Sequence, residues 1–176
     1  MSDSISIRRL GAEEAARQVG ALAEVLIDCV EGGASVGFMQ PLKRERALDF
    51  WHHVADGVAR HERVLLVAED AAGQIAGTVQ LVMALPDNQP HRGDVAKMLV
   101  RRAFRRRGIA ARLLAAVEGA ARAETRSVLV LDAVTGGDAE RLYGRSGWRR
   151  VGVVPKFALM PDGTFCSTTY FYKHLE

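Results

Sequence analysis

Apolar and polar residues alternate along the first third of the chain with two different spacings. Residues 5–9 alternate between isoleucine and polar side chains, which is the two-residue period of a half-buried strand. From Ala12 to Glu31 the apolar side chains return every three or four residues, as on one buried face of a helix. The same helical spacing recurs from Leu42 to Arg60. The pattern therefore predicts a strand and two helices, with residues 32–41 in a connecting loop.

The rest of the chain consists mainly of short apolar runs separated by turn residues. Two helical patterns interrupt these runs, one beginning at Ile109 and a shorter one over Gly137–Arg145. Strands are predicted over Val64–Glu69, Gln74–Leu85, Val95–Val100, Val128–Val134, Trp148–Leu159 and Phe165–Tyr172. This order of elements predicts an α/β fold with a mixed sheet, and not a doubly wound parallel one.

Composition narrows the class of protein only a little. A chain of 176 residues with 48% hydrophobic residues can form a single domain, residues 1–176, with a substantial core. The net charge of +3 is small, so binding to polyanions by the whole surface is not indicated. Two cysteines do not suggest a disulfide framework. No apolar run suits a membrane span or a secretory signal, so we expect a cytoplasmic protein with no membrane partner.

A basic turn separates the strand that ends at Val100 from the helix that begins at Ile109. Residues 101–107 contain five arginines, and Gly108 and Ala110 follow them. The first N–H groups of a helix lack partners within the helix and carry partial positive charge, so they attract phosphate. A glycine without Cβ and a small alanine would let a phosphate approach the backbone closely. The turn therefore predicts a phosphate site.

Arginine clusters also occur on nucleic-acid-binding surfaces, so that alternative must be weighed. The position of Gly108 and the abrupt start of the helix favour the phosphate site, because a plain basic patch requires neither. An NTPase P-loop is not indicated, because no Gly-Lys-Ser/Thr follows the glycine.

The turn resembles a known signature. Arg105-x-x-Gly108-x-Ala110, followed later by Leu142-Tyr143 and Ser146-Gly147-Trp148, is similar to the acyl-CoA-binding pattern of the GNAT acetyltransferases. The resemblance implies a GNAT-type mixed, mostly antiparallel sheet of about seven strands flanked by about four helices. It also implies acetyl-CoA as co-substrate and no metal. The residues that it assigns to acetyl-CoA are Met98, Leu99, Val100, Arg105, Arg106, Arg107, Gly108, Ile109, Ala110 and Tyr143.

In that family the strand before the turn is bulged and parts from its neighbour. The resemblance then implies that the Met98 N–H polarises the acetyl carbonyl and that Val100 pairs with pantetheine through its backbone. From the residues alone, Met98, Leu99 and Val100 are also ordinary core positions. Both interpretations can hold, since only the backbone would act.

A closer likeness extends over most of the chain. The segment Gly32–Met39, Asp94 with Lys97, Asp132, Tyr143 and Pro161-Asp162-Gly163 together resemble the tabtoxin resistance acetyltransferases. This resemblance implies a small polar acceptor, an antibiotic-like or toxin-like compound such as tabtoxinine-β-lactam. It also raises Phe38 and Met39 as walls of an acceptor cavity. The pattern alone favours a different role, in which these two side chains pin their loop to the core.

Three side chains are candidates for the chemistry of acetyl transfer. Asp132 interrupts an apolar strand, where a carboxylate costs free energy unless it is paired, so it could bind an acceptor ammonium or cap the next turn. Asp94, at the start of its strand, could act as base or pair with Arg92 or Lys97. We expect the two carboxylates to work together, one orienting the acceptor and the other receiving its proton. Tyr143 could protonate the departing thiolate or simply pack.

The leading hypothesis is therefore an acetyl-CoA-dependent acetyltransferase that acts by direct attack on a small-molecule acceptor, through an amine or a hydroxyl group. The alternatives are a protein or peptide N-acetyltransferase, a non-catalytic acyl-CoA-binding regulatory module, and a nucleic-acid binder. We expect no nucleic-acid partner, and the sequence leaves a homodimer open.

Overall fold

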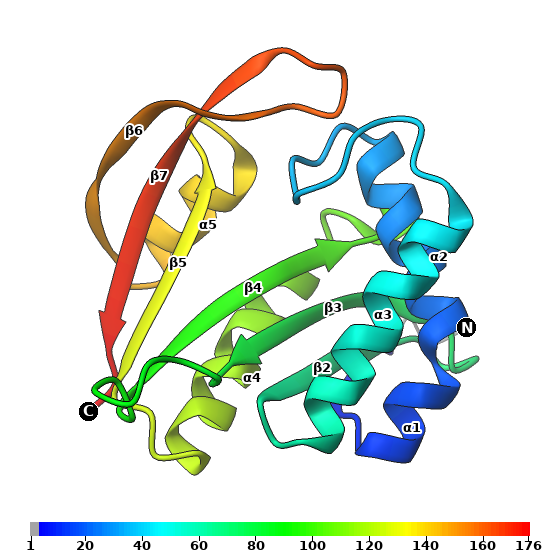
Figure 1. Cartoon of the computed structure of the whole chain (residues 1–176), viewed down its shortest axis with the longest axis horizontal. Coiled ribbons are helices and arrows are strands. Elements are labelled where there is room, and N and C mark those ends of the chain that lie inside the picture. Colours follow the sequence, from blue (N-terminus) through cyan, green and yellow to red (C-terminus); the bar gives the residue numbers. More distant parts are fainter. Residues whose placement is uncertain (1–3) are drawn as a thin grey trace.

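Seven strands form one sheet in a computed structural model that describes residues 4–176 (Figure 1). Their order across the sheet is β1-β2-β3-β4-β5-β7-β6. The strands are β1 (Ser6–Arg9), β2 (Arg63–Glu69), β3 (Ile75–Val82), β4 (Arg92–Val100), β5 (Val128–Val134), β6 (Arg149–Leu159) and β7 (Phe165–His174). Only β4 and β5 run parallel; all other neighbours are antiparallel. The predicted mixed, mostly antiparallel sheet is confirmed.

Helices cover both faces of the sheet (Figure 1). The first three, α1 (Ala12–Arg17), α2 (Val19–Glu31) and α3 (Arg44–Ala59), share a buried cluster with one face that includes the fully buried Trp51. On the opposite face, α4 (Ile109–Ala123) and α5 (Asp138–Arg145) share a second cluster that includes Leu113 and Tyr143. A 3₁₀ turn, η1 (Arg102–Phe104), links β4 to α4. The sheet is therefore the middle layer of three.

Some predicted boundaries were wrong. The single helix expected over residues 12–31 is two helices, because Gln18 leaves helical geometry at φ −91° and ψ 2°. The apolar stripe continues through this break, so the spacing of hydrophobic residues could not reveal it. The strand expected from Val95 begins instead at Arg92, because residues 92–94 pair with β5 although two of their side chains are polar. Asp94 thus lies inside β4 and does not open it.

A buried carboxylate joins α4 to the strands that follow. Glu118, 8% exposed, accepts hydrogen bonds from Lys173 Nζ at 2.8 and 2.9 Å and from Trp148 Nε1 at 2.9 Å. A buried charge is tolerated when it is paired and hydrogen-bonded in this way. Trp148 in turn lies beside Tyr143, with 6.0 Å between ring centroids. The network therefore helps to hold α5 and Tyr143 against the sheet.

None of the helices within residues 4–176 is both long enough and apolar enough to cross a membrane.

Candidate active site

The parallel strands β4 and β5 stay together over only three residue pairs. Arg92, Gly93 and Asp94 pair with Val128, Leu129 and Val130, and the two strands then separate (Figure 1). From Val95 to Val100, the β5-facing edge of β4 has no partner in the sheet. Unpaired backbone N–H and C=O groups on a strand edge are available to an extended ligand. The split therefore opens a place for a ligand in the middle of the sheet.

A bulge lies in β4 at this split. Between the pairs Gln80–Ala96 and Thr78–Leu99, the two residues Lys97 and Met98 stand opposite Val79 alone. Lys97 has a φ of +51°, a value that costs free energy for a residue other than glycine. The family resemblance implied this bulge next to Met98, and the structure contains it. Leu99, 1% exposed, can offer a ligand only its backbone, while Met98 and Val100 are partly buried.

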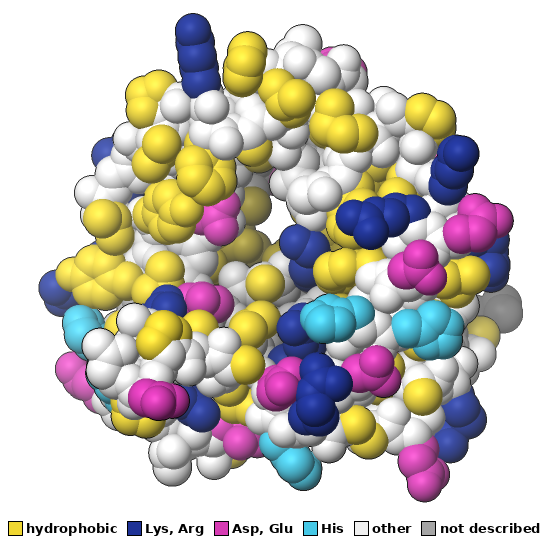
Figure 2. Space-filling view, viewed as in Figure 1, with side chains coloured by type: hydrophobic (Ala, Val, Ile, Leu, Met, Phe, Trp, Pro, Cys, Tyr) yellow, Lys and Arg dark blue, Asp and Glu magenta, His cyan; other side chains and the backbone are white. Residues whose placement is uncertain are grey.

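The front face of the molecule is hollowed between the β6–β7 hairpin and the α3 side, and side chains of both charges line the hollow (Figure 2). The loop between α2 and α3 crosses to the hairpin beside this hollow. Ser35 Oγ donates a 2.9 Å hydrogen bond to Leu159 O, and Gln40 N donates one of 3.0 Å to Pro161 O. The cleft between the separated strands is thus bounded by the sheet, α3, the loop and the hairpin.

Asp132 projects from β5 on the open face of the sheet. Alternation along β5 places it on the face opposite the buried Leu131 and Ala133, and the register with β4 places Asp94 on that same open face. Burial raises the pKa of the Asp132 carboxyl; Lys97 works to lower it, and Asp94 raises it further. The two carboxylates predicted to act together therefore do face one cleft.

Asp94 has a partner within its own strand. Its carboxylate forms an ion pair with the Arg92 guanidinium, which also donates from Nε to the Gln89 side chain at 2.7 Å. This is one of the pairings that the sequence left open, and Lys97 is not part of it. Among residues 4–176, by contrast, Asp132 has no hydrogen bond or ion pair from its side chain. Asp132 is therefore the freer of the two carboxylates to meet an acceptor.

Tyr143 lies on α5, in the buried cluster on the face of the sheet opposite Asp132. It is 4% exposed and packs edge-on against Phe171, with 5.8 Å between ring centroids. Burial, and secondarily the negative charge of Asp132, raise the pKa of its phenol to about 12. Its hydroxyl makes no hydrogen bond to another residue of the described chain. The phenol is thus a neutral proton donor at physiological pH, close enough to Asp132 to sense its charge.

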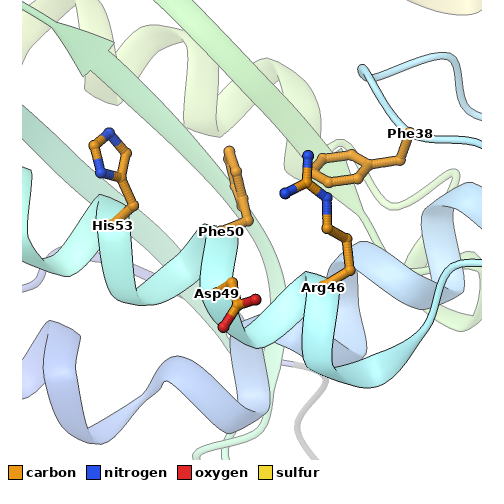
Figure 3. Close-up of a pocket in the computed structure, with 5 residues that line it drawn as sticks. All are labelled: Phe38, Arg46, Asp49, Phe50 and His53. Carbon is orange, nitrogen blue, oxygen red and sulfur yellow. The ribbon is translucent and has the colours of Figure 1, made fainter.

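A pocket of about 200 Å³ adjoins the cleft on the α3 side (Figure 3). Phe38 from the loop and Arg46, Asp49, Phe50 and His53 from α3 line it, and the Phe38 and Phe50 rings meet edge to face at 5.3 Å. In Figure 3 the Arg46 guanidinium points toward the Phe38 ring, while Asp49 points away from the other side chains. Met39, 46% exposed, lines a second hollow beside it together with Phe38.

Sequence reasoning missed the α3 residues of this pocket. They lie at positions 46, 49, 50 and 53, interleaved with the buried positions 47, 51, 54 and 58. Their own spacing of three and four residues was a usable signal of a shared second face. Polar residues on the outer face of an amphipathic helix usually meet only solvent, so this spacing alone does not mark them as pocket residues.

The basic turn has the geometry expected of an anion site. Gly108 is the N-cap of α4 at φ +72°, and no side chain caps the helix. The first bond inside the helix runs from Arg112 N to Gly108 O at 3.1 Å, so the N–H groups of Ile109, Ala110 and Ala111 have no partner within the helix. A Cβ built on Gly108 would meet no atom within 4 Å. The start of α4 is therefore open, and only a residue tolerant of positive φ fits there without strain.

The predicted arginines are distributed around this opening. Arg105, Arg106 and Arg107 are all exposed. Arg105 Nε donates to Val100 O at 3.2 Å, and the Arg107 guanidinium lies 5.2 Å from the centre of the Phe104 ring. Ile109 is buried under the turn, and Ala110 is partly exposed. The structure thus brings residues 105–110 together at the end of the strand that carries Met98 and Val100.

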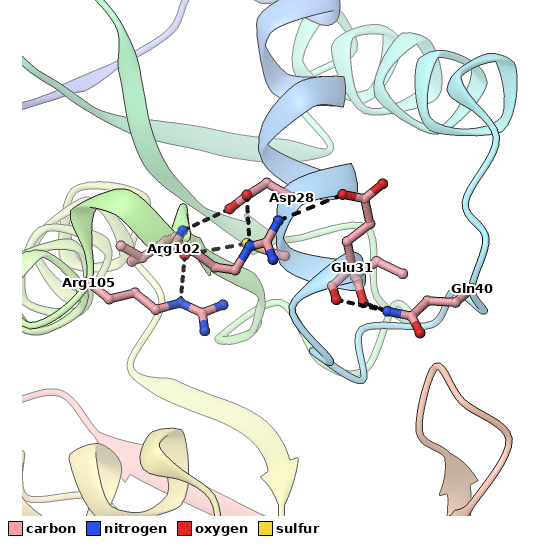
Figure 4. A network of polar contacts seen from close by, with 8 residues as sticks. Asp28, Glu31, Gln40, Arg102 and Arg105 are labelled. Carbon is pink, nitrogen blue, oxygen red and sulfur yellow. Dashed lines mark hydrogen bonds and ion pairs between the residues drawn. The ribbon is translucent and has the colours of Figure 1, made fainter.

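An acidic side chain anchors the entry to the turn (Figure 4). Asp28 of α2 accepts hydrogen bonds from Arg102 N at 2.7 Å and from Arg102 Nε at 2.9 Å. Gln40 Nε2 closes the same region by donating to Val30 O at 2.8 Å and Glu31 O at 2.9 Å. Burial works to raise the pKa of Asp28, but the N–H groups of Arg102 outweigh it, and the pKa is lowered overall.

We expect Asp28→Ala to destabilise the fold by about 1–3 kcal/mol, because it removes the acceptor of the Arg102 N–H. A carboxyl whose pKa is lowered by folding contributes stability above its unfolded pKa, and this contribution is lost as pH falls through the folded value. The difference in unfolding free energy between wild type and Asp28→Ala, measured by denaturant melts, should therefore be largest at pH 7 and decrease below about pH 4. Glu31→Ala, whose carboxylate lies 3.7 Å from Arg102 and is more exposed, serves as control. An equal cost for both variants, independent of pH, would contradict this role of Asp28.

Comparison with known proteins identifies the family. Residues 34–148 match the model of the "Acetyltransferase (GNAT) family". An uncharacterized N-acetyltransferase from the hisH-hisA intergenic region of Azospirillum brasilense is 35% identical over 113 residues, which are 63% of this chain and 65% of that relative. The chain thus matches just under two thirds of that relative's length.

Solved structures share the fold over nearly the whole chain. A ribosomal-protein-alanine N-acetyltransferase from Brucella melitensis superposes with a TM-score of 0.81 at 22% identity, covering 97% of this chain and 99% of that one. The yncA protein of Salmonella typhimurium, solved with its cofactor acetyl-CoA, gives a TM-score of 0.78 at 18% identity, covering 98% and 95%. With a family match that spans most of its length, and with the sheet of that family, the chain belongs to the GNAT family of acetyltransferases.

Proposed function

We propose that this protein transfers the acetyl group of acetyl-CoA directly to an amine or hydroxyl group of a small polar acceptor. The observation that carries the proposal is the split between β4 and β5. The split lies between the open start of α4 and the two carboxylates Asp132 and Asp94, and Tyr143 is buried behind β5. The same cleft thus offers free backbone groups for an acyl carrier and titratable groups for the chemistry.

The residues at the turn fit the diphosphate of acetyl-CoA. Three N–H groups without helical partners face an opening that no protein atom fills at Gly108, and the neighbouring arginines add positive charge. The β4 edge at Met98 and Val100 has no partner strand and suits the pantetheine arm, with Val100 O already accepting from Arg105 Nε. The Met98 N–H would hold the acetyl carbonyl. Leu99 would contribute its backbone alone. Acetyl-CoA, when bound, supplies the activated acetyl group.

We assign the acid–base steps to Asp132, Asp94 and Tyr143. One carboxylate orients the acceptor and the other receives the proton that the acceptor loses as its nitrogen or oxygen bonds to the acetyl carbon. Asp132 is the better proton acceptor, because burial raises its pKa and it lacks a partner in the described chain, whereas Asp94 is held by Arg92. As the carbon–sulfur bond breaks, Tyr143 gives its phenolic proton to the sulfur. The proton held by Asp132 then returns to the Tyr143 oxygen through solvent, which restores both groups. The products are the acetylated acceptor and free CoA thiol.

The dimensions of the site favour a small acceptor. The pocket beside the cleft holds about 200 Å³ with Phe38 in its wall, and the second hollow, which Phe38 and Met39 line together, holds about 450 Å³. Likeness to the tabtoxin resistance acetyltransferases supports an antibiotic-like or toxin-like compound such as tabtoxinine-β-lactam. The relative from Brucella melitensis is named for acetylating a ribosomal protein, and this supports a second candidate, acetylation of a peptide N-terminus.

Both cysteines are buried and neither is in a disulfide, which is consistent with a reducing cytoplasm. We propose that the protein acts there without a nucleic-acid or membrane partner.

The test is release of free CoA thiol from acetyl-CoA in the presence of amines, hydroxy-amino acids and short peptides, each at several concentrations. We expect turnover with small acceptors and little with peptides. Thiol release with peptides alone would instead support the second candidate. Tight acetyl-CoA binding with no turnover on any acceptor would indicate a non-catalytic acyl-CoA-binding module. A salt-dependent shift in the mobility of DNA, without CoA binding, would indicate a nucleic-acid binder.

Single asparagine substitutions test the carboxylates. We expect Asp132→Asn to lower kcat about 100-fold and Asp94→Asn to lower it less, because Asp132 is assigned the proton and Asp94 the orientation. Asp162→Asn, on the exposed turn between β6 and β7, is the control and should leave kcat unchanged. If neither cleft variant lost turnover, the paired role of the two carboxylates would be wrong.

A further inference from the structure

We propose that Lys97 binds an anionic group of the acceptor, so that the acceptor is a zwitterion with a carboxylate-like group next to the amine that is acetylated. This inference rests on the proposed function and narrows its substrate class. The bulge in β4 then has two roles: it frees the backbone at Met98 for the acetyl group, and it directs the Lys97 amine into the cleft.

The bulge places the Lys97 amine between three different elements. Its Nζ lies 5.7 Å from the centre of the Phe50 ring on α3, and a Cβ added to Gly37 of the loop would lie 3.8 Å from it. It also senses the charge of Asp132 on β5. Phe50 in turn lines the pocket beside the cleft. The amine therefore lies where the pocket meets the separated strands.

No protein acceptor satisfies this amine. Within residues 4–176, Lys97 Nζ makes no hydrogen bond and no ion pair, and its contact with the Phe50 ring is its one close polar interaction. Burial lowers the pKa of Lys97, although the charge of Asp132 opposes this effect. A partly buried cation without an anionic partner costs free energy, and a bound anion would recover it.

Asp132 and Lys97 carry opposite charges and face the same cleft, but they do not form an ion pair. Each shifts the pKa of the other, yet they are too far apart for an ion pair, and both side chains lack partners in the described chain. A ligand with a cation near Asp132 and an anion near Lys97 would satisfy both. A neutral or purely cationic acceptor would leave Lys97 unsatisfied, so charge complementarity selects the zwitterion.

A second cation strengthens the positive potential on the Lys97 side. Arg63 also lowers the pKa of Lys97, and its own Nη1 donates to the Gln80 side chain at 2.8 Å, without an ion pair to any described carboxylate. Of the other two carboxylates near the cleft, Asp94 is already paired with Arg92, and Asp49 of the pocket points away from the other side chains drawn in Figure 3. Positive charge around Lys97 is therefore in excess, as a site for an anion requires.

The test compares amino-acid acceptors with their carboxamides, which keep the amine and the side chain and lose the negative charge. For wild type we expect kcat/KM with the acid to exceed that with the amide by at least about tenfold. Lys97→Met, which keeps the length of the side chain, should remove most of this preference through a higher KM for the acid, with little change for the amide. The matched control is Lys156→Met: Lys156 has the same φ of +51° and lies 5.9 Å from the Phe165 ring centre, but on the exposed β6.

Two results would overturn the inference while leaving the proposed function intact. One is turnover with equal kcat/KM on acids and amides. The other is a Lys97→Met variant whose kcat falls equally with both acceptors, which would instead place the amine at the acetyl carbonyl. Failure of the proposed function is distinguishable from these, because no acceptor of either kind would then release CoA thiol.

Discussion

Replacing Gly108 with aspartate is expected to weaken acetyl-CoA binding about 100-fold while leaving the protein folded. Gly108 adopts φ +72° at the open start of α4, where a Cβ would point into space and not into protein. An aspartate there would place a negative charge beside the N–H groups that we assign to the diphosphate. Loss of one or two charge-assisted hydrogen bonds, each worth about 1.5–3 kcal/mol, accounts for a change of this size. Titration calorimetry with acetyl-CoA measures it.

Two further variants separate charge from strain. Gly108→Ala adds no charge but still places an L-residue at positive φ, so it should cost about 1–2 kcal/mol of stability and weaken binding much less than aspartate. Gly119→Asp introduces the same charge within α4, eleven residues further on, where a Cβ also meets nothing within 4 Å. It should leave acetyl-CoA affinity nearly unchanged. Equal losses at positions 108 and 119 would mean that general charge, and not the turn, controls binding.

The Tyr143→Phe substitution is expected to lower kcat by about 100-fold with little effect on acetyl-CoA affinity or stability. Phenylalanine fills the same buried space beside Phe171 and Trp148, and the lost hydroxyl has no hydrogen-bond partner among the described residues. A positioned general acid contributes about 100-fold or more to the rate. Steady-state kinetics combined with calorimetry separates the two quantities.

The pH profile gives an independent check on Tyr143. Because its pKa is raised to about 12, the phenol keeps its proton well above the usual tyrosine value near 10. The wild-type rate should therefore not fall between pH 8 and about 10 through loss of this acid. Tyr172→Phe on β7 removes a hydroxyl elsewhere and should behave like wild type. Unchanged turnover in Tyr143→Phe would reduce this residue to a packing role.

Much of this architecture could be predicted from the sequence, for identifiable reasons. The strand and helix periods around residues 95–123 differ so clearly that the turn between them could be located to a few residues. Gly108 within that turn, followed by the small Ala110, pointed to an open helix start, and the structure has one. Asp132 stood out because a carboxylate within an apolar strand needs a reason, and the structure places it in the cleft with no protein partner in the described chain.

Other features depend on tertiary contacts that no local pattern reports. The positive φ at the bulge belongs to Lys97 and not to a glycine, so the residue type alone did not predict it. The break at Gln18 preserves the apolar stripe on both sides and therefore left no trace in the spacing of hydrophobic residues. The α3 residues form a pocket wall only because the loop that carries Phe38 packs against the helix, and no local pattern in α3 indicates this contact. In each case the partner that gives the residue its role is distant in sequence.

The central claim is that the open start of α4 binds the diphosphate of acetyl-CoA. The most direct measurement is the heat of binding of acetyl-CoA to the unmodified protein, compared with that of acetyl-pantetheine, which carries the same acyl arm but lacks the diphosphate and the phosphorylated adenosine attached to it. We predict measurable binding of acetyl-CoA and at least about 100-fold weaker binding of acetyl-pantetheine. Equal affinities for the two compounds, or no heat with acetyl-CoA, would contradict the account.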